Sequence, residues 1–245
     1  MSSFIPTGCR PIDEILGGGL ECGIVTQVYG EPGSGKTNLC LQAAIECSKS
    51  GKKVIFIDTE GLSLNRFSQI AGERSKEIAQ NILIYEPMSF DEQYTAICEI
   101  EKILGENIGL IVVDSATSFY RFELDDELSG IQSRRELSNQ IGFLQGMARK
   151  SGVAVLITNQ IFSDVSRGEN GSSYGNSNIS NGRNNSSNGS SNVRPIGGKA
   201  IEHISKTILQ LEKTGAGTRI AKIIKHRCRP EGEICEFTIT AEGLR

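Results

Sequence analysis

The sequence predicts an α/β fold in which a mostly parallel, twisted β-sheet is flanked by helices and followed by a C-terminal antiparallel meander. Apolar runs of strand length alternate with amphipathic stretches of helix length, and a glycine-rich turn follows the first of these strands. After residue 200 the segments are short, β-rich and separated by Gly or Pro, which is typical of antiparallel strands. A chain of 245 residues can bury a sizeable core, so we expect residues 1–245 to form a single domain.

Each element is assigned from its apolar periodicity and its flanking turn residues. The expected parallel strands are 24–29, 53–58, 82–85, 109–114 and 153–158. The expected helices are 36–48, 64–72, 90–104 and 134–150. The meander is expected at 207–212, 219–224 and 234–240.

Composition narrows the class of protein. A net charge of −3 and 38% hydrophobic residues are typical of a soluble protein. No apolar run is long enough to span a membrane and the first residues are not a signal peptide, so we expect a cytoplasmic protein without a membrane partner. Its seven cysteines lack C-x-x-C spacing and lie mostly in expected core segments, which favours buried free thiols over zinc ligands.

The run Gly30-Glu31-Pro32-Gly33-Ser34-Gly35-Lys36-Thr37 links the first expected strand to the first long helix. It fits G-x-x-x-x-G-K-[ST], a loop whose backbone N–H groups surround the phosphates of a nucleoside triphosphate. Glycines permit positive φ and a close approach of the backbone to the phosphates, which the helix N-terminus also attracts. Lys36 can reach the β- and γ-phosphates, and the Thr37 hydroxyl can bind Mg²⁺. The motif therefore predicts ATP and Mg²⁺ as ligands.

Polar residues at the carboxyl ends of three other expected strands complete this site. Asp114 ends the strand 109–114 and is expected to hold the metal, often through water. Glu60 follows the strand 53–58 and can orient or deprotonate the water that attacks the γ-phosphate, although a solvated loop glutamate is the alternative. Gln160 follows the last parallel strand, where it can sense the γ-phosphate by hydrogen bonding.

Directly after Gln160 the composition changes. Of the 31 residues 163–193, 23 are Ser, Asn or Gly. Such a segment has too little apolar surface to offset its ordering entropy, so we predict a mobile loop over 163–195. A long loop at this place is either functional or a tolerated insertion, and its position next to Gln160 would couple nucleotide state to loop order.

In this order the motifs resemble those of the RecA superfamily of ATPases. The resemblance covers nearly the whole chain: it includes the segment 6–20, which ends in Gly17-Gly18-Gly19-Leu20, the phosphate loop, and the segments 56–61, 110–115, 157–160 and 196–203. Within the superfamily the chain is most similar to the archaeal RadB family, paralogues of the strand-exchange recombinases. Two departures from the recombinases favour the paralogue. The core begins near Pro6, so no N-terminal helix–hairpin–helix domain is expected, and Lys225-His226-Arg227 stands where recombinases have an aspartate-containing segment that caps the neighbour's ATP.

The resemblance implies a RecA-like core with Lys36, Thr37, Glu60, Asp114 and Gln160 as phosphate, magnesium, water-activating and sensor residues. It implies an accessory protein of DNA repair and homologous recombination that hydrolyses ATP slowly. The implied partners are DNA, a recombinase or Holliday-junction resolvase, and a second copy of the chain in a homodimer.

The resemblance places two DNA-binding loops near 121–135 and 163–195. Their basic residues are Arg121, Arg134, Arg135, Arg167, Arg183 and Arg194. Carboxylates outnumber the arginines of the first loop, and the second loop has few aromatic residues on which bases could stack. Because neutralisation of phosphates drives DNA affinity, we expect weak, salt-sensitive and sequence-independent DNA binding.

Several residues near the C-terminus are candidates for a role between subunits. His203 matches a recombinase histidine that communicates between the γ-phosphate and the DNA loop, or else is a polar residue at the start of a helix or strand. Lys225, Arg227 and Arg229 alternate, so on a strand they would share one face. They could form a solvated edge, prevent edge-to-edge aggregation or act on a neighbour's ATP. The surrounding cations would oppose protonation of His226.

Two other functions stay open. ATP could be a structural ligand that switches partner binding without turnover. A KaiC-like signalling ATPase would instead form hexameric rings and phosphorylate itself. The presence of both Glu60 and Gln160 favours hydrolysis.

Overall fold

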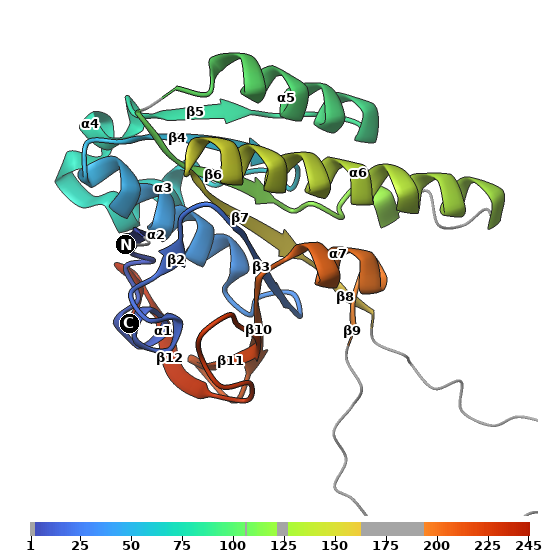
Figure 1. Ribbon diagram of the computed structural model, residues 1–245. Coiled ribbons are helices and arrows are strands. Elements are labelled where there is room, and N and C mark those ends of the chain that lie inside the picture. The colour runs from blue at the N-terminus through green and yellow to red at the C-terminus, as the bar shows by residue number, and fades with distance from the viewer. Residues whose placement is uncertain (1–2, 106, 122–126, 163–193) are drawn as a thin grey trace, which may run out of the picture.

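The computed structural model describes residues 3–105, 107–121, 127–162 and 194–245. Its centre is a nine-stranded sheet with the order β13-β12-β11-β10-β3-β7-β6-β4-β5 (Figure 1). The parallel strands are β3 (Val25–Gly30), β4 (Lys53–Asp58), β5 (Ile82–Tyr85), β6 (Ile108–Asp114) and β7 (Ala154–Asn159). These are the five strands that the apolar runs predict, displaced by at most one residue at either end.

The C-terminal strands extend the same sheet on the other side of β3. β10 (Thr207–Lys213) runs parallel to β3, and antiparallel pairing then adds β11 (Thr218–Lys225), β12 (Ile234–Thr240) and β13 (Gly243–Leu244). Two small antiparallel ladders lie outside this sheet: β1 (Phe4–Ile5) with β2 (Leu20–Glu21), and β8 (Ile161–Phe162) with β9 (Arg194–Pro195). The predicted mostly parallel sheet with a terminal antiparallel meander is confirmed.

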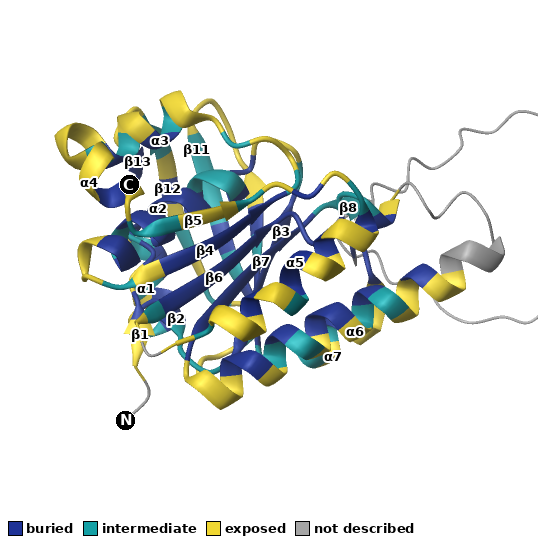
Figure 2. Ribbon diagram, turned by 90° about the horizontal axis from the view of Figure 1, so that it is seen from above, coloured by how far each residue is buried: buried dark blue, intermediate teal, exposed yellow. Residues whose placement is uncertain are grey.

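Helices cover both faces of the sheet. One core contains residues of α1 (Arg10–Leu16), α2 (Lys36–Lys49), α3 (Leu64–Ala71) and α4 (Ser75–Ala79), with the 3₁₀ turn η1 (Gly72–Arg74) between the last two. The other core contains residues of α5 (Phe90–Ile103), α6 (Glu127–Ser151) and α7 (Gly198–Ile204). Figure 2 shows the strands buried between these layers, and exposed residues on the outer faces of the helices. β3 and β7 are buried throughout because both of their faces are covered.

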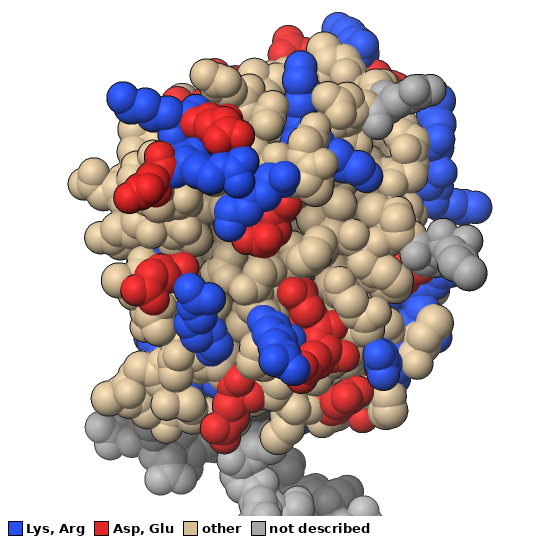
Figure 3. All heavy atoms as spheres, turned by 90° about the vertical axis from the view of Figure 1, so that its left-hand side faces the viewer, with Lys and Arg blue, Asp and Glu red and all other residues tan. Residues whose placement is uncertain are grey.

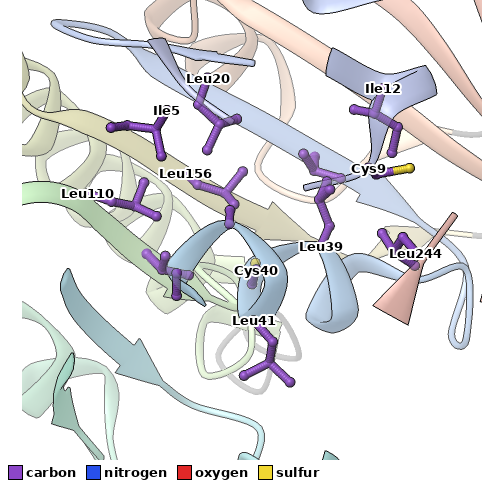
Figure 4. Close-up of a cluster of buried hydrophobic side chains, with 14 of the residues drawn as sticks. Ile5, Cys9, Ile12, Leu20, Leu39, Cys40, Leu41, Leu110, Leu156 and Leu244 are labelled. Carbon is purple, nitrogen blue, oxygen red and sulfur yellow. The ribbon is translucent and has the colours of Figure 1, made fainter. Parts of the chain in front are cut away.

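The core around α2 joins the two ends of the chain to the centre of the sheet. Leu39, Cys40 and Leu41 of this helix belong to one cluster with Leu156 of β7 and Leu244 of β13 (Figure 4). The seven cysteines are free, as expected; three are buried (Cys9, Cys40 and Cys47), while Cys228 is exposed and the others are partly covered. The expectation of buried thiols therefore holds for these three cysteines but not for the other four.

Two sequence predictions need correction in the fold. α6 begins at Glu127 rather than at residue 134, because the helix continues through Gly130 despite the cost of about 1 kcal/mol that a glycine brings to a helix interior. The last two residues of the predicted loop 163–195 form strand β9. Residues 163–193, with the predicted mobile loop, lie outside the described residues.

The side chain of Gln42 on α2 ties the N-terminal segment to the last strand. Its amide nitrogen donates to the carbonyl oxygens of Gly8 and Leu244, and its amide oxygen accepts from the backbone N–H of Leu244 at 2.6 Å. Gln42 is buried, so these backbone groups have little access to water.

The variant Gln42→Leu is expected to lose about 2 kcal/mol of unfolding free energy, because it leaves buried backbone groups unpaired. Urea denaturation followed by circular dichroism measures the loss. The exposed Gln80 is the matched control, and Gln80→Leu should change stability by less than about 0.5 kcal/mol. Equal losses in the two variants would contradict this interpretation of Gln42.

Candidate nucleotide-binding site

The candidate site lies where the carboxyl ends of four parallel strands meet. The sheet order β3-β7-β6-β4 places these strands side by side, so the residues that follow them gather at one edge. The phosphate loop follows β3 and leads directly into α2. Asp114 ends β6, Glu60 follows β4 and Gln160 follows β7.

The glycines of the loop have conformations and neighbours that exclude side chains. Gly33 and Gly35 have φ of 74° and 109°, which residues with a Cβ rarely adopt. A Cβ on Gly30 would lie 2.2 Å from the carbonyl oxygen of Leu211 in β10. The loop is therefore backed by the C-terminal meander, which leaves no room for a side chain at Gly30.

Lys36 is folded into the loop. Its ammonium donates to the carbonyl oxygens of Gly30 at 2.9 Å and Glu31 at 3.1 Å. Burial lowers the pKa of Lys36, and the carboxylates of Glu60 and Asp114 oppose this shift. These carbonyl oxygens can be exchanged for phosphate oxygens, which bind an ammonium more strongly because they are charged.

Asp114 is almost completely buried, with 2% of its surface exposed. Its carboxylate accepts hydrogen bonds from the hydroxyls of Thr158 and Thr37. The pKa of Asp114 is raised to about 6: burial is the main cause and Glu60 adds to it, whereas the two threonines and Lys36 oppose the shift. A cation would relieve the cost of keeping this carboxylate ionised.

The oxygen atoms of Asp114 and Thr37 are the type of ligand that Mg²⁺ prefers, and Mg²⁺ usually keeps several waters and binds substrate phosphates as well. Within the described residues, no group of three or more His, Cys, Asp or Glu side chains could hold a metal ion. The arrangement thus fits a metal held jointly by the protein and a nucleotide.

Glu60 is positioned by a turn that Asp58 holds. The carboxylate of Asp58 accepts from the backbone N–H groups of Glu60 at 3.2 Å, Gly61 at 3.0 Å and Leu62. The neighbouring Thr59 hydroxyl bonds to the backbone of Ser115, the residue after Asp114. These bonds hold the exposed Glu60 side chain at the same edge as the phosphate loop.

A chain of two hydrogen bonds links Glu60, Gln160 and Arg121. The amide nitrogen of Gln160 donates to Glu60 Oε1 at 2.8 Å, and Arg121 Nη1 donates to Gln160 Oε1 at 2.8 Å. Glu60 and Gln160 are thus brought together, as the sequence predicts. The contact of Arg121 with Gln160 was not predicted, because no local sequence pattern connects residues 39 positions apart.

Both ends of the predicted loop are anchored beside Gln160. The backbone N–H of Ile196 donates to the carbonyl oxygen of Gln160 at 3.0 Å, and the Asn159 side chain donates to the carbonyl oxygen of Ile196 at 3.2 Å. The β8–β9 ladder extends this connection to Arg194. Of the DNA-binding candidates in this loop, Arg167 and Arg183 lie outside the described residues.

The first predicted DNA loop, 121–135, is shorter than expected. Arg134 and Arg135 belong to α6 rather than to a loop, and Arg134 contacts the Tyr120 hydroxyl at 3.5 Å. Residues 122–126 lie outside the described residues.

Figure 3 shows the face on the side of the two termini, where basic and acidic side chains are interspersed rather than gathered in a basic strip.

Two intersubunit candidates, His203 and Lys225, line one open groove between α7 and the strands β10 and β11. His203 is exposed there. The Lys225 ammonium donates to the carbonyl oxygens of Glu202 at 2.7 Å and Ser205 at 2.8 Å, so it caps the C-terminal end of α7. Within this chain Lys225 therefore has a defined structural contact.

The prediction that Lys225, Arg227 and Arg229 share a strand face is wrong. β11 ends at Lys225, and the backbone turns so that the N–H groups of Cys228 and Arg229 both donate to His226 Nδ1 at 3.1 Å. Arg227 forms an ion pair with Glu21 at 3.0 Å. The pKa of His226 is lowered as expected, but burial is the first cause and the nearby arginines are secondary.

Fold and site together define a RecA-like ATPase core. The model of the Rad51 family matches residues 3–245, and the chain belongs to this family. It is 61% identical over 239 residues to the "DNA repair and recombination protein RadB" of Methanococcoides burtonii, covering 98% of this chain and 96% of the relative. The corresponding protein of Archaeoglobus fulgidus is 44% identical over 242 residues, covering 98% and 97%.

A solved structure described as the crystal structure of the RadB recombinase is also similar. It matches with a TM-score of 0.77 and 34% identity and covers 98% of both chains. In the part of the chain that the structure describes, no helix has the length and apolar character needed to cross a membrane.

The variant Asp114→Asn is expected to unfold at a higher urea concentration than the wild type at pH 7, without nucleotide or metal. The folded-state pKa of about 6 lies above the ordinary value of 3.8, so the stability of the wild type falls as the pH rises through this window. The variant stays neutral and should gain about 2–3 kcal/mol above pH 6, with the difference vanishing below pH 3.8.

Urea titrations at several pH values measure this difference. The exposed Glu242 is the matched control, and Glu242→Gln should show no comparable pH-dependent gain. If Asp114→Asn is destabilised equally at all pH values, burial does not raise the pKa of Asp114 as described.

Proposed function

We propose that this protein is an ATP-binding accessory factor of DNA repair and homologous recombination that hydrolyses ATP slowly. The single observation that carries the proposal is the convergence of Lys36, Thr37, Asp114, Glu60 and Gln160 at one edge of the sheet. The names of its relatives in the Rad51 family supply the biological setting.

Each of these residues has a distinct proposed role in phosphoryl transfer to water. Lys36 and the backbone N–H groups of the loop bind the phosphates, and Thr37 and Asp114 hold Mg²⁺. The metal would neutralise charge on the phosphate oxygens. Glu60 orients or deprotonates the attacking water, and Gln160 responds to the γ-phosphate.

The hydrogen-bonded chain of Glu60, Gln160 and Arg121 supports slow turnover. In this arrangement the Glu60 carboxylate accepts a hydrogen bond from Gln160, and the amide oxygen of Gln160 accepts one from Arg121. A carboxylate oxygen that accepts a hydrogen bond from an amide N–H is less basic, so it is less available as a base for water. DNA phosphates near Arg121 would compete for its guanidinium, which would link DNA binding to the hydrolytic residues.

We further propose that DNA binding is weak and sequence-independent, and that Arg121, Arg134, Arg135, Arg167, Arg183 and Arg194 contribute to it. Recombinases or Holliday-junction resolvases are the proposed protein partners, and the chain is proposed to form a homodimer in the cytoplasm. The groove with His203 and Lys225 is a proposed part of the dimer contact; Arg227 is a second candidate, although it is paired with Glu21.

A second candidate function is a partner-binding switch that binds ATP without hydrolysis. The hydrogen bond from Gln160 to Glu60 favours this switch, since a carboxylate that keeps this bond permanently would not activate water. The two functions share the binding site and differ only in turnover.

Substitution of Lys36 tests the nucleotide site. Lys36→Ala should weaken MgATP binding at least about 100-fold and abolish phosphate release with or without single-stranded, double-stranded and branched DNA. Isothermal titration and a phosphate-release assay provide these measurements. Lys49→Ala at the other end of α2 is the matched control, because the Lys49 ammonium pairs with Glu46 on the helix surface. Normal ATP binding by Lys36→Ala would refute the phosphate-loop assignment.

Substitution of Glu60 separates the two functions. Glu60→Gln should bind MgATP with nearly unchanged affinity and release phosphate at least about 100-fold more slowly, because the amide cannot accept the proton of water. Single-turnover phosphate release is the readout. Glu73→Gln, on the exposed turn η1, is the control. A wild-type protein that binds ATP but releases no phosphate under any DNA condition would favour the switch.

A further inference from the structure

The hairpin of β10 and β11 extends beyond the carboxyl end of β3 and runs beside the phosphate loop. Leu211 of β10 is the last residue in register with β3, opposite Gly30. β10 continues to Lys213, which is paired with Arg219 of β11. Two basic residues that no motif identifies are therefore placed next to the loop.

Both residues contact the loop. Arg219 Nε donates to the carbonyl oxygen of Gly33 at 3.2 Å, and the backbone N–H of Lys213 donates to Glu31 Oε1 at 3.2 Å. The end of the Lys213 side chain lies 3.2 Å from the position that a Cβ of Gly33 would occupy. The hairpin thus contacts the loop at its middle as well as at its start.

The Arg219 side chain is itself held in place. Its Nη1 donates to the carbonyl oxygens of Thr218 at 2.9 Å and Gly215 at 3.4 Å, within the same hairpin. A guanidinium whose Nη1 is fixed by its own turn presents its Nε–H to Gly33 with little loss of side-chain entropy.

The bond to Gly33 also sets the direction of the following N–H. In a trans peptide the C=O and the next N–H point in opposite directions. With the Gly33 oxygen turned toward Arg219, the N–H of Ser34 points into the loop, where it donates to the carbonyl oxygen of Glu31 at 3.1 Å. N–H groups that point inward are the ones that can bind phosphate.

We propose that Arg219 is a positioning residue for nucleotide binding: it holds the Gly33 carbonyl away from the phosphates and so keeps the Ser34 N–H turned into the loop, where a phosphate oxygen would replace the Glu31 carbonyl as its acceptor. This inference rests on the proposed nucleotide site. Lys213 adds a second positive charge over the same loop, close enough to Lys36 to lower its pKa. Residues far apart in sequence, on the meander, thereby complete the phosphate-binding loop.

The variants Arg219→Ala and Arg219→Met test the proposal. Both remove the N–H donor, and the methionine keeps the aliphatic stem and its packing. Each should raise the Kd for MgATP and MgADP, and the KM for ATP, about tenfold, the effect expected for one charge-assisted hydrogen bond. The turnover number should stay within about twofold of the wild type, because Arg219 contacts neither Glu60 nor Gln160.

Lys222→Ala is the matched control, because Lys222 is a basic residue on the opposite face of the same strand. Titration calorimetry measures the Kd for nucleotide, and thermal denaturation of the nucleotide-free chain measures its stability. Unchanged affinity in both Arg219 variants would overturn the inference, as would an equal loss of affinity in Lys222→Ala. Failure of the wild type to bind nucleotide would instead refute the proposed function, so the two failures can be distinguished.

Discussion

The burial of the Asp114 carboxylate beside Thr37 is the constraint on which the site depends. A carboxylate with so little exposed surface costs free energy unless it meets a cation or several donors. Two threonine hydroxyls offset part of this cost, yet the pKa of Asp114 still rises to about 6. The strand order keeps this charge next to the phosphate loop, so the protein retains an unfavourable local arrangement that a metal and a triphosphate would relieve.

The surrounding structure connects the Asp114 carboxylate and the phosphate loop to more distant parts of the chain. Hydrogen bonds join the ends of β4 and β6 through Thr59 and Ser115, and β7 to the segment before α7 through Asn159 and Ile196. The meander supports the loop from the other side through Leu211. The site is thus formed by segments from both halves of the chain, and none of the segments forms it alone.

The sequence predicts the parallel strands well because their apolar runs are continuous and bounded by turn residues. The limits of β4, β5 and β12 agree with the predictions at both ends. The phosphate-loop motif and the places of Glu60 and Gln160 after their strands were also predicted, since motif spacing and strand order bring them to one edge; the hydrogen bond between Gln160 and Glu60 was not predicted. Short elements such as α1 and α7 were missed, because they have too few residues for a clear periodicity.

One of the remaining errors concerns a local turn, and another concerns a contact between residues far apart in the sequence. Alternation of Lys225, Arg227 and Arg229 indicated a strand, but the bonds of His226 turn the chain after Lys225. Arg121 was assigned to DNA alone, and its bond to Gln160 depends on how β6 and β7 lie in the sheet. The contact between Arg121 and Gln160 follows from tertiary packing and has no local pattern in the sequence.

A crystal structure with a non-hydrolysable ATP analogue and Mn²⁺ in place of Mg²⁺ tests the central claim most directly. Our account predicts an anomalous peak for manganese next to the Thr37 hydroxyl and the Asp114 carboxylate, with the triphosphate enclosed by the glycine-rich loop. A nucleotide bound elsewhere, or a manganese ion that is distant from Asp114, would contradict it.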